Sequence, residues 1–271
     1  MISYREIANG FKQLNIPSHQ PVLAHIADPV ISEIKGGADT LLAALLATVD
    51  NVMMPTFTFQ TMVVPRTGPT NNALDYGTED KEMSAEAFTA SLPCSSEMGK
   101  TAEELRNHAQ ARRSPHPILS FSGVGVDAAL NAQTFLEPWA PIQKLSELNG
   151  WVLLVGCDQT VNCTLHLAEG IAGRKQFIRW ALTEEKVVEC PHFPGCCKGF
   201  NALDSTNMEE PQQSMIGSSL VRAFSMPNLI GHAVDLLQKD PSALLCSQPG
   251  CVYCSEVRHW ITSRSHWLPL R

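Results

Sequence analysis

A short apolar run enclosed by two glycines does most to restrict the fold of this chain. Residues 151–155 read Trp-Val-Leu-Leu-Val and offer no charged side chain to either face of a strand. Such a run is typical of a strand that is covered on both sides. Further strands are expected at 22–28 and 51–59, with an apolar helix over 40–49 between them. Strands that alternate with helices predict an α/β protein with a mixed, mainly parallel central sheet.

The rest of the chain continues this alternation. We expect helices over 96–112, 127–133, 164–172 and 227–238, a strand at 118–122 and a hairpin over 177–190. Residues 60–92 are rich in Pro, Thr and Asn and predict a long excursion, which in compact domains is usually functional or mobile. No linker divides the sequence, so we expect one domain over 1–271, with a Cys-rich part from about 190 to 271.

Composition and charge bear on the partners of the chain. The formal charge is −7 over 271 residues, with no run of five or more like charges. This balance disfavours nucleic acid and favours neutral or cationic partners. The first residues lack a basic segment followed by an apolar run, and no apolar stretch reaches the about 18–20 residues of a membrane span. These features predict a cytoplasmic protein that binds no membrane.

The strongest candidate site follows the apolar run, where Asn162, Thr164, His166 and Glu169 lie at and beyond the start of an expected helix. His166 and Glu169 are three residues apart and therefore share a helical face. An imidazole that is steadied by a carboxylate is suited to taking a proton near neutral pH. The same spacing is common on solvated helices, so the pattern alone also allows a surface pair.

Two turns could hold an anionic group. Arg113 and Ser114 stand in a proline-framed turn that presents a guanidinium and a hydroxyl, as phosphate recognition requires, although an ordinary loop has the same composition. Gly36 and Gly37 precede a helix, where small residues allow a ligand to approach the backbone and the first amides favour anions. A simple turn explains the two glycines equally well.

The nine cysteines suggest a metal site in the C-terminal part of the chain. Clusters of cysteine in a reducing compartment are more often metal ligands or buried thiols than disulfides. Cys196, Cys246, Cys251 and Cys254 could supply the four thiolates of a structural zinc site. The alternative is that they are small buried thiols.

Two weaker alternatives also arise from the sequence. Cys157 and Cys163 stand near His166, which leaves a catalytic cysteine open, although neither has a distinguishing context. Residues 123–128 match the dinucleotide pattern G-x-G-x-x-A after a short strand. The unit around them lacks the helix, strand and terminal acidic residue that usually accompany this pattern.

Taken in order, these motifs resemble those of the aminoglycoside 3-N-acetyltransferase family. The chain is similar to that family at His25, at 36–40, at Met54-Pro55-Thr56 and at Met98-Gly99. The two specific matches are Arg113-Ser-Pro-His-Pro117 and Asn162-Cys-Thr-Leu-His-Leu-Ala-Glu169. The similarity spans about residues 20–180.

The resemblance implies a three-layer α/β/α-like fold of the antibiotic-acetyltransferase type, with acetyl-CoA as co-substrate. His166 would deprotonate an acceptor amine, and Glu169 or Glu189 would orient its imidazole. Thr164 or backbone amides would donate to the tetrahedral oxyanion. The residues implied to hold coenzyme A are His25, Gly36, Gly37, Arg113, Ser114 and Asn162.

The acceptor implied by the resemblance is the 3-amino group of an aminoglycoside-type antibiotic, a reaction that gives antibiotic resistance. One alternative is a relative that acylates a different amine in secondary metabolism. Another is a non-catalytic relative that binds zinc. One departure bears on the coenzyme site, because the family's His-Ser-Ser-Leu reads His-Ile-Ala-Asp at 25–28 and both hydroxyls are absent.

Overall fold

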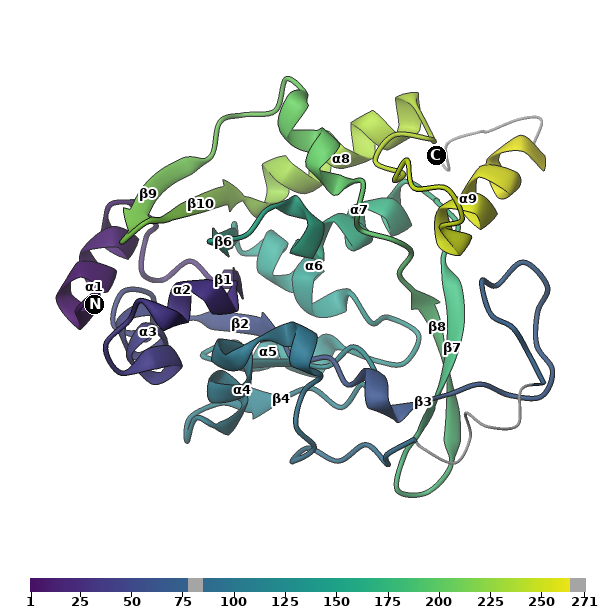
Figure 1. Ribbon diagram of the computed structural model, residues 1–271, viewed down its shortest axis with the longest axis horizontal. Coiled ribbons are helices and arrows are strands. Elements are labelled where there is room, and N and C mark those ends of the chain that lie inside the picture. Colours follow the sequence, from purple (N-terminus) through teal and green to yellow (C-terminus); the bar gives the residue numbers. More distant parts are fainter. Residues whose placement is uncertain (78–84, 264–271) are drawn as a thin grey trace.

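A seven-stranded sheet forms the centre of the computed structural model, which describes residues 1–77 and 85–263 (Figure 1). Its strand order is β4-β5-β2-β1-β6-β10-β9. The strands are β1 (Val22–Ile26), β2 (Val52–Pro55), β4 (Arg112–Arg113), β5 (Phe121–Val124), β6 (Trp151–Val155), β9 (Gln212–Ile216) and β10 (Ser219–Ser225). The central strand β1 runs parallel to β2 and β6, and the outer pairs are antiparallel. The predicted α/β class and mixed sheet are confirmed.

Helices cover both faces of this sheet and enclose two apolar cores. One face carries α1 (Tyr4–Lys12), α2 (Asp28–Ser32), α3 (Gly37–Leu46) and α4 (Lys100–Asn107), and the other carries α5 (Asp127–Ala132), α6 (Ala140–Glu147), α7 (Thr164–Ile171) and α8 (Met226–Lys239). Val152 and Leu154 of β6 enter one core, whereas Leu153 and Val155 enter the other. This alternation explains why the run at 151–155 is apolar throughout.

A smaller antiparallel sheet stands beside the large one. It consists of β3 (Met62–Val63), β7 (Phe177–Leu182) and β8 (Val187–Phe193), in the order β3-β7-β8. The hairpin expected over 177–190 is therefore present, and its turn is closed by Thr183 N–H donating to the Lys186 carbonyl at 2.9 Å. The C-terminal helix α9 (Val252–Ser263) lies near this sheet in Figure 1. None of the described helices is long and apolar enough to cross a membrane.

Two expected elements differ from the structure for identifiable reasons. The helix expected over 96–112 is broken at Gly99, whose φ of +82° separates the short 3₁₀ turn η3 (Ser96–Met98) from α4. Asp28 then accepts a hydrogen bond from Lys100 N–H at 2.8 Å and caps α4. The strand expected at 118–122 begins only at Phe121, because Nδ1 of His116 accepts hydrogen bonds from the amides of residues 118 and 119 and holds them in a turn.

The expected excursion over 60–92 contains β3 and otherwise little regular structure in its described part, and residues 78–84 lie outside the described residues. Short 3₁₀ turns occur at η1 (Phe59–Thr61), η4 (Gln159–Val161) and η5 (Phe200–Ser205). The turn η4 bridges β6 and α7, so the most apolar strand leads directly into the helix with the candidate base.

Candidate active site

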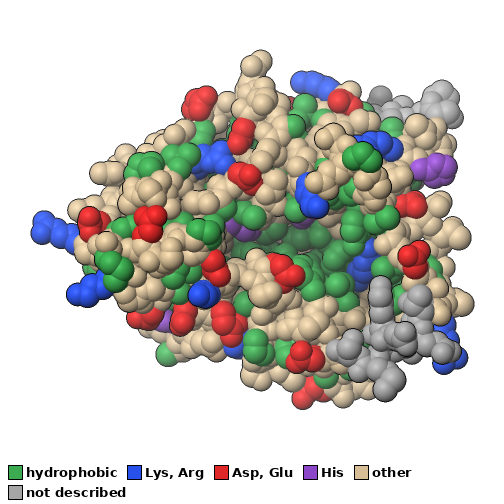
Figure 2. Space-filling model, in the orientation of Figure 1, with side chains coloured by type: hydrophobic (Ala, Val, Ile, Leu, Met, Phe, Trp, Pro, Cys, Tyr) green, Lys and Arg blue, Asp and Glu red, His purple; other side chains and the backbone are tan. Residues whose placement is uncertain are grey.

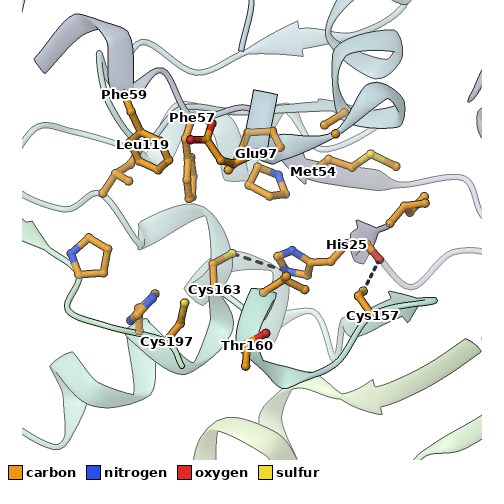
Figure 3. Close-up of a pocket in the computed structure, with 18 of the residues that line it drawn as sticks. His25, Met54, Phe57, Phe59, Glu97, Leu119, Cys157, Thr160, Cys163 and Cys197 are labelled. Carbon is orange, nitrogen blue, oxygen red and sulfur yellow. Dashed lines mark hydrogen bonds between the residues drawn. The ribbon is translucent and has the colours of Figure 1, made fainter. Parts of the chain in front are cut away.

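A cavity of about 560 Å³ lies at the carboxyl ends of β1, β2 and β6. Ligands of open α/β sheets bind at this edge, where loops and helix starts converge. Figure 2 shows the hollow lined mainly by hydrophobic side chains, and Figure 3 shows the lining at close range. Its walls come from β1 and α2, the end of β2, η3, the η4–α7 segment, the loop after β8 and α9. The volume is typical of a pocket for a small molecule.

His166 projects from the first turn of α7 onto this cavity. The helix starts where it does because Asn162 Oδ1 accepts a hydrogen bond from Thr164 N–H at 3.1 Å. The imidazole lies between two aromatic rings, with its centroid 5.6 Å from that of Trp139 and 4.9 Å from that of Phe200. These contacts fix the plane of the ring while one edge remains at the cavity.

A buried chain of charges runs from His166 away from the cavity. Nδ1 of His166 lies 2.7 Å from Glu169 Oε2, and Arg174 donates to Glu169 Oε1 at 2.9 Å. Burial alone would raise the pKa of the Glu169 carboxyl, but the hydrogen bond from His166 and the charge and hydrogen bond of Arg174 outweigh it and hold this pKa below its usual value. Glu169 is therefore a carboxylate at neutral pH.

The carboxylate determines which ring nitrogen of His166 is basic. Because Glu169 can only accept, Nδ1 carries the hydrogen and Nε2 carries the lone pair. No described residue forms a hydrogen bond with Nε2. The arrangement can take a proton from a ligand in the cavity and stabilise the resulting imidazolium through Glu169.

A second histidine and two cysteines line the same cavity but differ in chemistry. His25 is buried at the end of β1, 3.7 Å from Cys163 Sγ, and burial lowers its pKa to about 3, so it is neutral (Figure 3). Cys157 donates to the His25 carbonyl at 3.3 Å, and burial raises its pKa to about 12. Burial also raises the pKa of Cys163. Since thiolates are the reactive form, the geometry favours His166 over either cysteine.

Three residues expected near the reaction lie away from the cavity surface. Thr164 is fully buried, and its hydroxyl has no hydrogen-bond partner among the described residues. Asn162 is also fully buried and donates to Gln159 Oε1 at 2.9 Å, so its side chain organises the start of α7. Glu189 is exposed on β8, and it is Glu169 that bonds to His166; the expectation that Glu189 could orient the base is corrected.

Arg113 and Ser114 are occupied by contacts within the protein. The Arg113 guanidinium donates to the carbonyl oxygens of Thr56, Ala90 and Leu92. Burial lowers the pKa of Arg113 to about 10. The Ser114 hydroxyl is buried and accepts a hydrogen bond from the Phe121 amide at 2.8 Å. Neither residue lines the cavity. Both stabilise the backbone between β4 and β5.

The expected glycine sites also have local explanations. Gly36 and Gly37 have φ values of +88° and +67° at the start of α3 and do not line the cavity. Gly123, the first glycine of the dinucleotide-like pattern, lies in β5, where a Cβ would be 2.6 Å from the Val52 carbonyl oxygen. Close strand packing accounts for this glycine, so the pattern carries no nucleotide site of its own.

Several residues around His166 were not predicted from the sequence. Arg174 was detectable in principle, because a basic residue directly after a helix can reach back to a carboxylate in its last turn. The rings of Trp139 and Phe200 come from segments 27 and 34 residues away from His166 and leave no local signal. The same holds for Glu97, which together with Asp28 supplies the carboxylates of the cavity lining, whereas no Lys or Arg is among the lining residues described.

The four cysteines predicted as zinc ligands lie together, with all four sulfur atoms within 4.8 Å of one another. They are Cys196, Cys246, Cys251 and Cys254, and they lie beside the part of the cavity wall that Cys197 and Tyr253 form. The remaining cysteines stand outside this group.

Comparisons with known proteins give a consistent result. The family model described as aminoglycoside 3-N-acetyltransferase matches residues 23–238. The chain is 25% identical over 189 residues to aminoglycoside N(3)-acetyltransferase IV of Salmonella sp, covering 64% of this chain and 72% of that protein. It is 26% identical over 182 residues to aminoglycoside N(3)-acetyltransferase VII of Streptomyces paromomycinus, covering 63% and 61%.

Solved structures share the fold. The apoenzyme of AAC(3)-IVa aligns with a TM-score of 0.77 at 21% identity, covering 95% of this chain and 97% of that one. A variant of AAC(3)-IVa in complex with gentamicin aligns with a TM-score of 0.75 at 22% identity and the same coverage. AAC-IIIb in a binary complex with CoASH aligns with a TM-score of 0.67 at 18% identity, covering 88% and 96%.

Proposed function

The chain belongs to the aminoglycoside 3-N-acetyltransferase family, and from this membership we propose that it moves an acetyl group from acetyl-CoA directly to the 3-amino group of an aminoglycoside-type antibiotic. The chain is accordingly an acyltransferase. The observation that carries the proposal is the position of His166, which is held by Glu169 and Arg174 with Nε2 at the cavity.

In the proposed reaction, His166 Nε2 accepts a proton from the acceptor amine as the amine nitrogen attacks the carbonyl carbon of the thioester. The new N–C bond forms a tetrahedral intermediate, which collapses as the C–S bond breaks. Coenzyme A leaves as a thiolate and takes the proton from the imidazolium, so the products are an N-acetylated antibiotic and free coenzyme A. Holding both reactants in one cavity supplies part of the rate gain, and general base catalysis contributes about 10²–10⁴-fold.

The lining of the cavity has features that suit both proposed substrates. Its largely apolar interior suits the flexible arm of coenzyme A, which carries the thioester. The carboxylates of Asp28 and Glu97 are exposed at the lining and suit a polycationic acceptor. Gentamicin and CoASH, bound in the related structures, are ligands of these two kinds.

The coenzyme site cannot depend on the family's paired hydroxyls here. Ile26 and Ala27 line the cavity at that position and offer apolar contacts instead. We assign these two residues to packing against the coenzyme arm. His25, which is neutral and bonded through its backbone to Cys157, supports the same wall.

The test is turnover of acetyl-CoA with a panel of aminoglycosides, followed by mass spectrometry and NMR of the product to locate the acetyl group. His166→Ala should lower kcat by about 10²–10⁴-fold while leaving the binding of coenzyme A in place. The matched control is His19→Ala, since His19 is exposed and distant from the cavity, and it should retain full activity.

Two results would contradict the proposal. Full activity in His166→Ala would remove the assigned base. Absence of turnover with every aminoglycoside, together with measurable transfer to another amine, would replace the acceptor and keep the reaction class.

A further inference from the structure

Four cysteines from three separate segments converge next to the cavity. Cys196 follows β8, Cys246 stands between α8 and α9, and Cys251 and Cys254 lie just before and within α9. Their sulfur atoms all lie within 4.8 Å of one another. A disulfide requires only two sulfurs to meet, so disulfide formation alone does not explain a group of four.

The spacing of the sulfurs suits a tetrahedral metal ion. With Zn–S bonds of about 2.3 Å, the sulfur–sulfur edges of a tetrahedron are about 3.8 Å long. The sulfur–sulfur distances, at most 4.8 Å, reach this length after a contraction of up to about 1 Å. Four soft ligands in this arrangement select zinc or iron and disfavour magnesium and calcium.

The groups around the sulfurs resemble the outer contacts of a thiolate site. Lys198 N–H donates to Cys196 Sγ at 3.4 Å, an i to i+2 contact from the backbone to a ligand sulfur. The Lys198 ammonium also donates to Gln248 Oε1 at 3.1 Å and thereby joins the two turns. Such contacts orient metal ligands and are part of the site.

Positive charge lies where an anionic cluster would need it. One divalent ion with four thiolates has a net charge of −2. The Lys198 ammonium donates to Gln248 Oε1 at 3.1 Å, two residues from Cys246, and the Arg258 guanidinium donates to the backbone carbonyl of Cys246. These two cations contact the segment that carries Cys246 and can offset part of that charge.

The backbone segments that carry Cys196 and Cys246 are closely packed against each other. A Cβ at Gly199 would lie 2.4 Å from the Leu244 carbonyl oxygen and 2.7 Å from Cys246 N. Leu244 itself has a φ of +63°, which a branched residue rarely adopts. Strain of this kind persists where surrounding contacts hold it in place.

We propose that Cys196, Cys246, Cys251 and Cys254 bind one Zn²⁺ as a structural site. All four positions are filled by protein thiolates, so the ion has no open position for catalysis. Its role is to fasten α9 to the segment after β8. Tyr253, which lies between two of the ligands, forms part of the cavity wall and accepts a hydrogen bond from Arg179 at 3.0 Å. The zinc site therefore holds one wall of the substrate cavity.

Metal analysis of the full chain tests this directly. Protein prepared without chelators or an added metal-binding tag should contain one zinc per chain. Cys251→Ser changes a half-buried ligand and should lower the zinc content at least tenfold. Cys94→Ser is the matched control, because Cys94 is also half-buried but stands outside the group, and it should keep one zinc.

A second measurement keeps the proposal testable if the ligand variant folds poorly. Cobalt-substituted wild-type protein should show thiolate-to-cobalt charge-transfer absorption, and titration of native thiols with a mercurial should release one zinc per chain. After chelation, hydrogen exchange should rise in α9 and at 246–251, while β1 and β6 remain protected.

Three results of the metal analysis would each overturn the assignment. They are less than about a tenth of one zinc per chain, one iron per chain in place of zinc, or equal zinc in Cys251→Ser and wild type. None of these readouts depends on turnover. A failure of the zinc site is therefore distinct from a failure of the proposed acetyl transfer.

Discussion

The two nitrogens of His166 have different surroundings, and this difference determines which nitrogen faces a ligand. Nδ1 is bonded to Glu169 at 2.7 Å, whereas Nε2 is at the cavity. Glu169 is in turn held by Arg174, which also donates to the carbonyl oxygens of Pro241 and Ala243. The imidazole is thus linked, through Glu169 and Arg174, to a segment more than 65 residues away from Arg174 in the sequence.

Glu169→Gln should lower kcat by about 10²–10⁴-fold, because the amide can donate to Nδ1 and favour the tautomer with hydrogen on Nε2. Steady-state kinetics at a temperature where the variant is folded provide the measurement, since Arg174 loses its charged partner and the variant will be less stable. Glu189→Gln is the control and should retain activity, as Glu189 is exposed on β8. Equal losses in both variants would remove Glu169 from its orienting role.

His116 makes the stability of the fold depend on pH. Its Nδ1 accepts two backbone hydrogen bonds, and burial lowers its pKa from 6.5 to about 4. In the unfolded chain the ring takes up a proton near pH 6.5, so the unfolded state binds more protons below that pH. This contribution to stability is complete above pH 6.5 and is lost as the pH falls toward 4.

His116→Asn keeps an acceptor near the Nδ1 position and removes the titration. The free energy of unfolding in urea, measured from pH 7 to pH 4.5, should decline less steeply in this variant, by up to about 1.4 kcal/mol per pH unit. His19→Asn changes an exposed ring and should leave the slope unchanged. An unaltered slope in His116→Asn would show that other groups, such as the buried His25, carry the whole dependence.

At the scale of elements, the strands and helices that could be predicted are those whose burial is visible in the local sequence of apolar and polar residues. The strands at 22–26 and 151–155 are apolar because both faces are covered, and α7 follows as expected. The helix α9 was not predicted, since only Cys254 and Val257 are buried along it and its attachment depends on a distant segment. The sequence predicted a coenzyme contact for Asn162 and an oxyanion contact for Thr164, but the Asn162 side chain accepts a hydrogen bond from the Thr164 backbone amide at the start of the helix.

Arg113 is the clearest case of a motif residue with a structural role. Its guanidinium joins β4 to the end of β2 and to the segment at 90–92. A motif of one guanidinium and one hydroxyl cannot reveal whether its acceptors are phosphate oxygens or backbone carbonyls. Only the folded chain decides this.

Arg113→Lys should lower the free energy of unfolding by about 2–3 kcal/mol, because an ammonium cannot reproduce the fork of donors. The KM for acetyl-CoA should change less than about twofold. Arg112→Lys is the control, since Arg112 is exposed and its ion pair with Asp127 at 3.3 Å is solvated, and it should change stability by less than about 0.5 kcal/mol. A large rise in the KM for acetyl-CoA with an unchanged free energy of unfolding would instead indicate that Arg113 binds the coenzyme.

At the scale of the whole molecule, the smaller sheet and α9 complete the cavity that the larger sheet begins. Buried Arg179 connects them, donating to the carbonyl of Asn72 at 3.1 Å and to the Tyr253 hydroxyl at 3.0 Å. Its guanidinium also lies over the rings of Phe177, Phe193 and Tyr253. Cation–π contacts of this kind are favourable when desolvated.

Tyr253→Phe keeps the ring and removes one acceptor from Arg179, so it should lower the free energy of unfolding by about 1–3 kcal/mol with little change in KM. Tyr253→Ala also removes the ring from the cavity wall and should raise the KM for a substrate as well. Denaturant unfolding and kinetics of both variants provide the comparison, with Tyr4→Phe on the exposed surface as control. Identical KM values in all three would exclude Tyr253 from the substrate wall.

The two outer strands of the large sheet bear on self-association. An unprotected edge offers unpaired backbone groups to a second copy and can seed polymers. Here β4 is only two residues long and both are arginines, while β9 lies against α1 so closely that a Cβ at Gly10 would be 2.8 Å from the Met215 carbonyl oxygen. The β4 edge is short and charged. The β9 edge is covered by α1, which has a glycine at the point of contact. Within the described residues, neither edge of the large sheet therefore offers a long, uncovered strand to a neighbouring molecule.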